Sequence, residues 1–184
     1  WILKYISAFT NNPQAKGIDV CKLFNIDVKI SSNKDQNIDL RDFLETYNPD
    51  LVVLSGYMKI IPDDVVKLFK GRMINIHPSL LPKYPGLNTH KKVLDSQDPY
   101  HGATIHFVSN ELDGGAIILQ GKFEVDKNKT EEELKNITHQ VEYKIFPKVI
   151  TWFANDLIKL EFDKVFFKGK EVESPIVYIH HDKK

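Results

Sequence analysis

Hydrophobic and polar positions along the chain follow two periods, one typical of strands and one typical of helices. Short, uninterrupted apolar runs at 51–54 and 73–76 are typical of strands buried on both faces of a parallel sheet. Elsewhere apolar residues recur every three or four positions, as on one face of a helix, at 40–47, 62–69 and 134–145. Strands that alternate with helices predict an α/β domain with a mostly parallel sheet flanked by helices.

Further elements complete this arrangement without a repeat or an internal domain boundary. We expect strands at 1–9, 26–30, 101–108 and 116–125, helices at 14–24 and 88–96, and a hairpin around 165–172. Only a short turn separates 101–108 from 116–125, which predicts an antiparallel edge on the sheet. Polar Thr104 and His106 alternate with apolar neighbours, so one face of their strand is expected to be wetter. Asp39 is a candidate N-cap for the helix that follows it.

Charge and cysteine content narrow the functional classes. The 184 residues include 25 basic and 25 acidic side chains, so the formal net charge is zero. This balance argues against a dedicated binder of nucleic acids or membrane surfaces. The single cysteine, Cys21, excludes an internal disulfide and a cysteine metal cluster. We find no stretch typical of a signal peptide and no apolar run long enough to span a bilayer, so the cytoplasm is the expected location.

The stretch with the richest chemistry, 72–86, reads RMINIHPSLLPKYPG. Asn75 and His77 are two positions apart on the strand that ends there, so their side chains point to the same side. They lie at the carboxyl end of the strand, where open α/β sheets bind ligands. An asparagine amide can donate to a developing oxyanion, and an imidazole can donate or accept a proton near neutral pH. These properties suit acyl transfer.

Asp113 is a candidate third member of this group. Two glycines follow it and would allow a tight turn close to a ligand. A carboxylate beside His77 would also orient the imidazole ring. Each piece taken alone has an ordinary structural interpretation, because Asn-x-His is a short motif and Asp-Gly-Gly commonly forms a turn. The combination of the motifs in their order along the chain favours the functional interpretation.

In that order, 75–86, His90, His101 with Gly102, and 111–115 resemble the glycinamide ribonucleotide formyltransferases, a branch of the folate-dependent formyltransferases. The resemblance implies a Rossmann-like formyltransferase fold in a single domain. Members of this family begin with a strand, a Gly-rich phosphate loop and a helix. We therefore expect such a segment of about 25 residues before residue 1 in the full protein.

The resemblance also implies three sets of site residues. The catalytic residues are expected to be Asn75, His77 and Asp113. The pocket for the co-substrate, 10-formyltetrahydrofolate, is expected to contain Met58, Lys59, Ile61, Val66, Ser109, Asn110, Glu111, Leu112 and Gly114. The pocket for glycinamide ribonucleotide is expected to contain Gly56, Tyr57, Pro78, His139 and Glu142. Without the resemblance, Met58, Ile61 and Val66 are candidates for ordinary core positions.

The reaction that the resemblance implies, a step of purine biosynthesis, is direct attack of the nucleotide's primary amine on the formyl carbon. Asn75 and protonated His77 would stabilise the tetrahedral oxyanion, and Asp113 would hold His77 and assist proton transfer. No metal is expected, because the formyl donor is already activated and the nucleophile is a neutral amine. We expect a monomer or a homodimer, with no nucleic-acid or membrane partner.

Two other functional interpretations stay open. One is a formyltetrahydrofolate deformylase of the same superfamily, in which water replaces the amine. The segment 83–86 argues against this interpretation, because the deformylases differ in the loop after the shared Asn and His. The other is a non-catalytic protein that binds folate or a nucleotide. The presence of Asn75, His77 and Asp113 argues against it.

Overall fold

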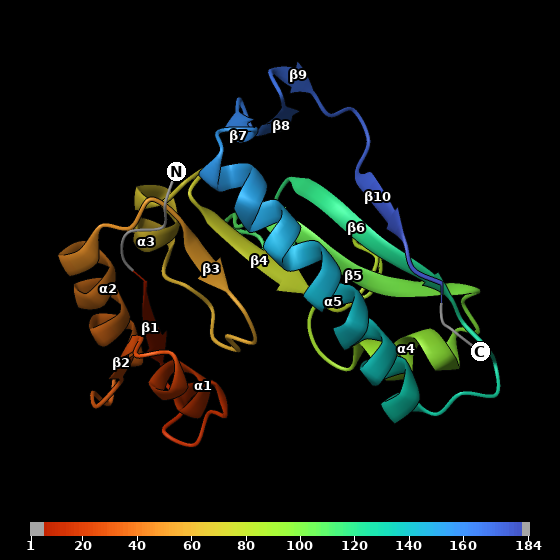
Figure 1. Cartoon of the computed structure of the whole chain (residues 1–184), viewed down its shortest axis with the longest axis horizontal. Coiled ribbons are helices and arrows are strands. Elements are labelled where there is room, and N and C mark those ends of the chain that lie inside the picture. Colours follow the sequence, from red (N-terminus) through yellow and green to blue (C-terminus); the bar gives the residue numbers. More distant parts are fainter. Residues whose placement is uncertain (1–5, 182–184) are drawn as a thin grey trace.

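The structure of the protein is a computed structural model that describes residues 6–181 (Figure 1). Its main feature is a five-stranded mixed sheet with the strand order β10-β6-β5-β4-β3. The strands are β3 (Val52–Leu54), β4 (Met73–His77), β5 (Tyr100–Phe107), β6 (Ile117–Glu124) and β10 (Ile176–Ile179). The β3–β4 and β6–β10 pairs are parallel, and the β4–β5 and β5–β6 pairs are antiparallel. The expected α/β class is confirmed. The antiparallel edge expected on the sheet is wrong, because the antiparallel strand β5 lies in the middle of the sheet and both outer pairs are parallel.

Two smaller sheets flank this central sheet. At the amino-terminal side, β1 (Ser7–Thr10) pairs in parallel with β2 (Asp27–Ile30), with α1 (Gly17–Leu23) between them. Near the other end of the chain, β7 (Ile158–Glu161), β8 (Lys164–Phe167) and β9 (Lys170–Glu171) form an antiparallel meander. The hairpin expected around 165–172 is confirmed, whereas β7 and β10 have no counterpart among the strands that the sequence predicts.

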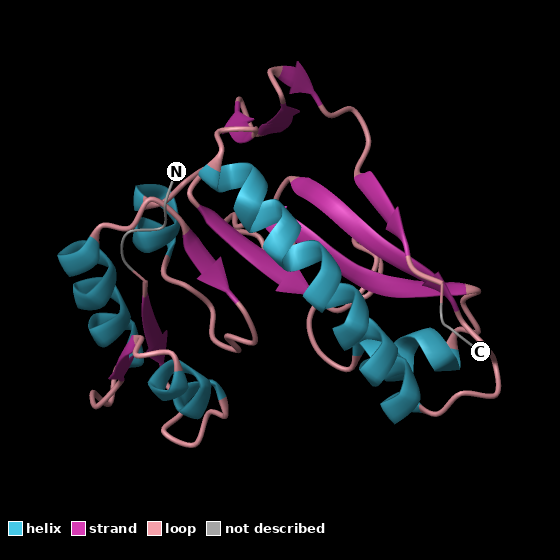
Figure 2. Ribbon diagram, viewed as in Figure 1, coloured by secondary structure: helices cyan, strands magenta, loops and turns pink. Residues whose placement is uncertain are grey.

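Four further helices pack on or beside the strands: α2 (Gln36–Tyr47), α3 (Asp63–Leu68), α4 (Thr89–Asp95) and α5 (Glu131–Ala154). The long helix α5 crosses one face of the central sheet (Figure 2). It begins with a capping box in which the Thr130 side chain accepts from the Glu133 backbone N–H and the Glu133 side chain accepts from the Thr130 backbone N–H. Gly121 of β6 lets this helix approach the sheet, because an added Cβ there would lie 2.2 Å from Val141 Cγ1.

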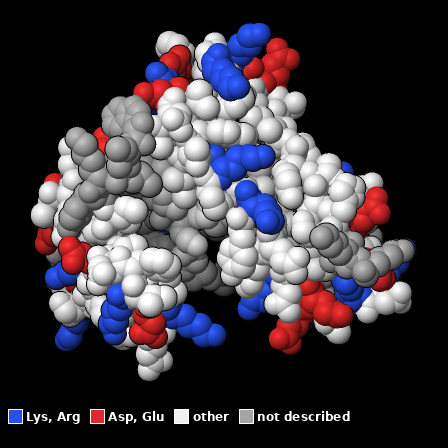
Figure 3. Space-filling view, in the orientation of Figure 1, with Lys and Arg blue, Asp and Glu red and all other residues white. Residues whose placement is uncertain are grey.

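The core has two parts. The larger one lies between α5 and the central sheet and contains Ile74, Ile105, Leu119 and Val141, all exposed by 1% or less. The smaller one joins α2 and α3 to β3 and to the start of β4. Residues of β4 belong to both cores, so side chains at the carboxyl end of β4 are carried by a well-packed element. On the face shown in Figure 3, basic and acidic side chains are interspersed.

Three local predictions are wrong. The strand β3 is at the end of its sheet rather than in its centre, one of its edges has no strand partner among residues 6–181, and Val53 is 39% exposed. The sequence predicts that the face of β5 with Thr104 and His106 is in contact with water. These residues are only 0% and 2% exposed, because loops fold over that face. Asp35 caps α2, whereas Asp39 accepts hydrogen bonds from 31–33.

Candidate active site

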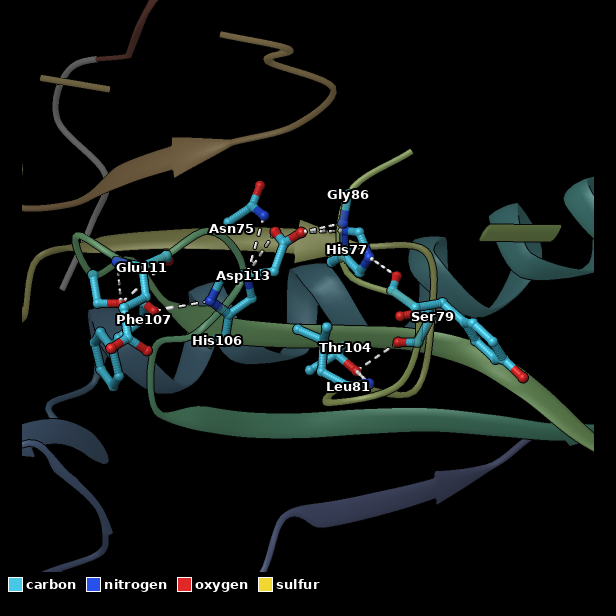
Figure 4. A network of polar contacts seen from close by, with 12 residues as sticks. Asn75, His77, Ser79, Leu81, Gly86, Thr104, His106, Phe107, Glu111 and Asp113 are labelled. Carbon is cyan, nitrogen blue, oxygen red and sulfur yellow. Dashed lines mark hydrogen bonds and ion pairs between the residues drawn. The ribbon is translucent and has the colours of Figure 1, made fainter. Parts of the chain in front are cut away.

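The strand β4 positions two of the predicted catalytic residues. Asn75 and His77 lie on the same side of β4, and their cross-strand partners in β5 are His106 and Thr104. His77 is 6% exposed, so its ring is held by packing on several sides. Figure 4 shows Asn75, His77 and His106 gathered around Asp113, which comes from the turn after β5.

The turn after β5 brings the third predicted residue to β4. Asp113 has a φ of +53° and is followed by two glycines. A Cβ on Gly115 would lie 1.7 Å from the carbonyl oxygen of Phe107, and one on Gly114 would lie 2.6 Å from Glu111 Cβ. Only glycine fits these two positions, so the Asp-Gly-Gly sequence allows the turn to fold closely onto the end of the sheet.

His77 and Asp113 form a buried pair. His77 Nδ1 lies 3.4 Å from Asp113 Oδ2, and the two side chains are 7% and 8% exposed. His77 Nε2 lies 2.9 Å from the carbonyl oxygen of Tyr84, which can only accept a hydrogen bond. Nε2 therefore carries a hydrogen. In a neutral ring, Nδ1 would then present a lone pair to the carboxylate. A hydrogen on both ring nitrogens satisfies both contacts, so the geometry favours an imidazolium–carboxylate pair.

Asn75 is held by a second histidine. Its amide Nδ2 lies 3.1 Å from His106 Nε2, and His106 Nδ1 lies 2.9 Å from the carbonyl oxygen of Phe107. Burial lowers the pKa of His106, which favours the neutral ring. A neutral ring that donates from Nδ1 to Phe107 accepts from Asn75 at Nε2. His106 thus orients the Asn75 amide. Its Nε2 also lies 3.8 Å from Asp113 Oδ1.

Sequence reasoning did not place His106, Tyr84 or Gly86 in the site. The backbone N–H of Gly86 donates to Asp113 Oδ2 at 2.8 Å, so the loop after β4 contacts both members of the ion pair. The polar position of His106 within an apolar alternation was the available signal for that residue. Tyr84 and Gly86 contact His77 and Asp113 through backbone atoms, which the pattern of side-chain types along the sequence does not reveal.

The predicted co-substrate residues fall into three groups. Met58 and Lys59 line an open hollow of about 460 Å³ together with 34–37 and Ile60. Ile61 and Val66 are 7% and 5% exposed and belong to the smaller core. The turn after β5 contains the other members, namely Ser109, Asn110, Glu111, Leu112 and Gly114. Leu112 is 68% exposed, so an apolar side chain is presented to solvent beside Asp113.

Three of the predicted nucleotide-binding residues adjoin the ends of β3 and β4. Gly56 follows β3 with a φ of +66°, and Pro78 directly follows His77. The Tyr57 hydroxyl is buried and has no hydrogen-bond partner within the described part of the chain. Burial raises the pKa of Tyr57.

The other two predicted nucleotide-binding residues lie on α5. Glu142 is half-buried, and burial raises the pKa of its carboxyl group to about 7. His139 lies one turn earlier, with its ring centroid 6.3 Å from that of Tyr143. Neither residue hydrogen-bonds to Asn75, His77 or Asp113 within 6–181, so the structure does not join them directly to the catalytic group.

A pair of histidines, one half-buried and one buried, joins α4 to the sheet. His90 Nδ1 lies 2.8 Å from His101 Nε2. Burial lowers the pKa of His90 to about 4 and that of His101 to about 3, so both rings are neutral near neutral pH.

In the region the structure describes, no group of three or more His, Cys, Asp or Glu side chains is arranged to hold a metal ion. No helix between residues 6 and 181 is long and apolar enough to cross a membrane.

Comparison with known proteins relates this arrangement to a family. The formyl transferase family matches residues 4–150. Phosphoribosylglycinamide formyltransferase of Haemophilus influenzae is 42% identical over 140 residues, which cover 76% of this chain and 66% of that protein. The Escherichia coli protein of the same name is 43% identical over 129 residues, which cover 70% of this chain and 61% of that protein.

A solved structure of a protein with the same name is also similar to this chain. Phosphoribosylglycinamide formyltransferase of Coxiella burnetii superposes with a TM-score of 0.87 at 35% identity, covering 94% of this chain and 85% of that one. The chain spans just under two thirds of the length of the two curated relatives. The family match covers the strand that carries Asn75 and His77, the turn that carries Asp113, and most of α5. The chain therefore belongs to the formyl transferase family.

Proposed function

We propose that this protein transfers the formyl group of 10-formyltetrahydrofolate to the primary amine of glycinamide ribonucleotide, as a step of purine biosynthesis. The observation that carries the proposal is the grouping of Asn75, His77 and Asp113 at the carboxyl end of β4. Relatives named phosphoribosylglycinamide formyltransferase support the choice of substrate. The group offers an amide donor, a positive charge and a carboxylate within one buried cluster.

The amine attacks the formyl carbon and the carbonyl oxygen becomes an oxyanion. Asn75 uses one N–H of its amide for His106 and has a second one for this oxyanion. Both ring nitrogens of His77 face protein groups, so His77 acts mainly as a fixed positive charge beside the oxyanion. Such preorganised groups commonly contribute the largest part of the stabilisation of this kind of transition state.

Proton transfer completes the reaction. A C–N bond forms to the nucleotide amine, the bond from the formyl carbon to N10 of the folate breaks, the amine loses a proton and N10 gains one. Asp113 lies next to His77 and is oriented by the Gly86 N–H, so it is the group best placed to assist this transfer.

The two substrates are assigned to different sides of the site. We assign the folate to the side formed by the turn after β5 and by the hollow beside Met58 and Lys59. We assign the nucleotide to the side of Gly56, Tyr57 and Pro78, with its ribose hydroxyl groups reaching Glu142 and His139 on α5. A partly desolvated carboxyl group such as that of Glu142 gains a hydrogen-bond partner when a hydroxyl group binds.

We also propose that a strand of the full protein lies between β1 and β3. Each of these strands has one edge without a strand partner among residues 6–181. Phe9 of β1 and Leu54 of β3 nevertheless pack against the same core cluster. A segment of about 25 residues that contains a strand, a loop and a helix would join the two sheets and add backbone N–H groups for the nucleotide's phosphate.

Variants of the catalytic group test the proposed function. Asn75→Ala and His77→Ala are each expected to lower the transfer rate by about 10²–10³, because each removes a group that stabilises the oxyanion. The assay follows formation of tetrahydrofolate in the presence of glycinamide ribonucleotide, with folding checked by circular dichroism. His181→Ala, which removes an exposed histidine near the end of the chain, serves as the control with the parent rate. A His77→Ala protein with the full rate would refute the mechanism.

A further inference from the structure

The loop at 78–86 contacts both members of the His77–Asp113 pair with opposite polarity. The Tyr84 carbonyl oxygen accepts from His77 Nε2 at 2.9 Å, and the Gly86 N–H donates to Asp113 Oδ2 at 2.8 Å. A carbonyl oxygen stabilises a positively charged donor, and an N–H stabilises a carboxylate. Two backbone groups of one loop therefore favour the form of the pair in which the proton lies on the histidine.

One end of this loop is fixed to the sheet. The Thr104 hydroxyl donates to the carbonyl oxygen of Ser79 at 2.6 Å and accepts from the backbone N–H of Leu81 at 3.0 Å. Gln120 Nε2 donates to the carbonyl oxygen of Leu81 at 2.7 Å. Ser79, Thr104 and Leu81 are exposed by 4% or less. Figure 4 shows the contact of Thr104 with the loop beneath His77.

The other end is fixed through the side chain of Tyr84. Its hydroxyl donates to Asp98 Oδ2 at 2.7 Å and lies 2.8 Å from Ser96 Oγ. Asp98 also accepts from Lys83 Nζ at 2.9 Å, and its carboxylate is 16% exposed. Hydrogen bonds from Lys83 and Tyr84 lower the pKa of Asp98, which keeps it ionised near neutral pH. Asp98 lies between α4 and β5, outside the loop that it holds.

The backbone of Tyr84 needs such an anchor. Its φ is +56°, a conformation that a bulky side chain rarely adopts without support from its surroundings. The same residue presents its carbonyl oxygen to His77 and its hydroxyl to Asp98. We propose that the hydrogen bond from the Tyr84 hydroxyl to Asp98 positions the Tyr84 carbonyl on His77, and so maintains the His77–Asp113 ion pair. Tyr84 and Asp98 are thus positioning residues, which act on the reaction through His77.

The first test does not depend on activity. Ring ¹⁵N shifts of His77 are measured in the ligand-free protein, and a His77→Gln sample identifies its signals. In Tyr84→Phe and Asp98→Ala, the His77 signals are expected to move toward those of a neutral ring that exchanges between tautomers. Asp98→Asn keeps an oxygen that accepts from Tyr84, so its shifts are expected to lie between those of the parent and of Asp98→Ala. Tyr100→Phe removes the hydroxyl of a tyrosine on β5, outside the loop, and is the matched control.

The second test measures turnover and rests on the proposed function. Tyr84→Phe and Asp98→Ala are expected to lower kcat by about 10- to 100-fold, since small misplacements of catalytic groups have effects of this size. KM is expected to stay within about threefold of the parent value, because neither residue is placed against a substrate. The pH profile of kcat is expected to change in these two variants and to be that of the parent in Tyr100→Phe.

The outcomes separate the two proposals. Parent ¹⁵N shifts in both Tyr84→Phe and Asp98→Ala overturn the positioning role, whatever the activity. Shifted signals in the two variants, together with a parent protein that shows no transfer activity, support the positioning role and contradict the proposed reaction. If Tyr84→Phe fails to fold by circular dichroism, Asp98→Asn and Asp98→Ala decide the question by the same shifts.

Discussion

At the scale of residues, the site depends on side chains that are held by buried backbone contacts. Asp113 receives a hydrogen bond from Gly86, and Asn75 is oriented by His106, which is itself fixed by the carbonyl oxygen of Phe107. Each catalytic group thus has a second layer of support. Such support keeps groups in the geometry of the transition state without reorganisation during the reaction.

Glu142 is expected to make the protein less stable as the pH rises. Its pKa is about 7 in the folded protein and 4.5 as the ordinary value, so between these pH values the unfolded chain releases a proton that the folded protein keeps. The free energy of unfolding therefore falls as the pH rises through this window. Glu142→Gln removes this effect. Its free energy of unfolding, relative to that of the parent, is therefore expected to rise by about 1–3 kcal/mol from pH 5 to pH 8.

Urea unfolding at the two pH values measures this gain. Glu132→Gln, an exposed change on the same helix, is the control and is expected to shift stability equally at both pH values. A Glu142→Gln protein whose stability follows that of the parent at both pH values would rule out a raised pKa at Glu142.

The residues of the candidate site differ in how far a sequence can predict them. Asn75 and His77 follow from the two-residue period of a strand, and the glycines after Asp113 indicate a turn. The pairing of Asn75 with His106 requires the register between β4 and β5, which no local pattern contains. Tyr84 contacts His77 through its carbonyl oxygen, which every residue type has.

At the scale of elements, the close contact between α5 and β6 depends on Gly121. A Cβ at this position would lie 2.2 Å from Val141 Cγ1 and 3.2 Å from two atoms of Ile145. Gly121→Ala is therefore expected to lower the free energy of unfolding by about 1–3 kcal/mol through overpacking. Gly17→Ala is the matched change at an open position, where nothing lies within 4 Å of the added atom.

The Gly17→Ala control is expected to raise stability by about 0.4–1 kcal/mol, since alanine restricts the unfolded chain. Chemical denaturation of both variants compares the two effects directly. Equal stabilities for the two variants would contradict the close packing of α5 on β6.

Elements with a strong period could be predicted, and those made by long-range contacts could not. The capping box and the apolar face of α5 are local signals. The strand β10 is short and has exposed Val177 and Ile179, and it exists because it pairs with β6 more than 50 residues earlier. The position of β3 at the edge likewise depends on which strands pair with it, not on its apolar composition.

At the scale of the whole molecule, α5 packs against the central sheet, which presents the end of β4. The antiparallel β5 and β6 bring the Asp113 turn back to that end. The mixed sheet explains how residues 38 positions apart, Asn75 and Asp113, meet in one cluster. This arrangement and the family membership support the proposed formyl transfer.

The central claim, transfer of a formyl group to a nucleotide amine, is tested most directly by one measurement. Formation of tetrahydrofolate from 10-formyltetrahydrofolate is followed with and without glycinamide ribonucleotide, using protein whose amino terminus is confirmed by intact mass. We predict turnover that requires the nucleotide. Turnover at the same rate without the nucleotide would contradict this account and identify water as the acceptor.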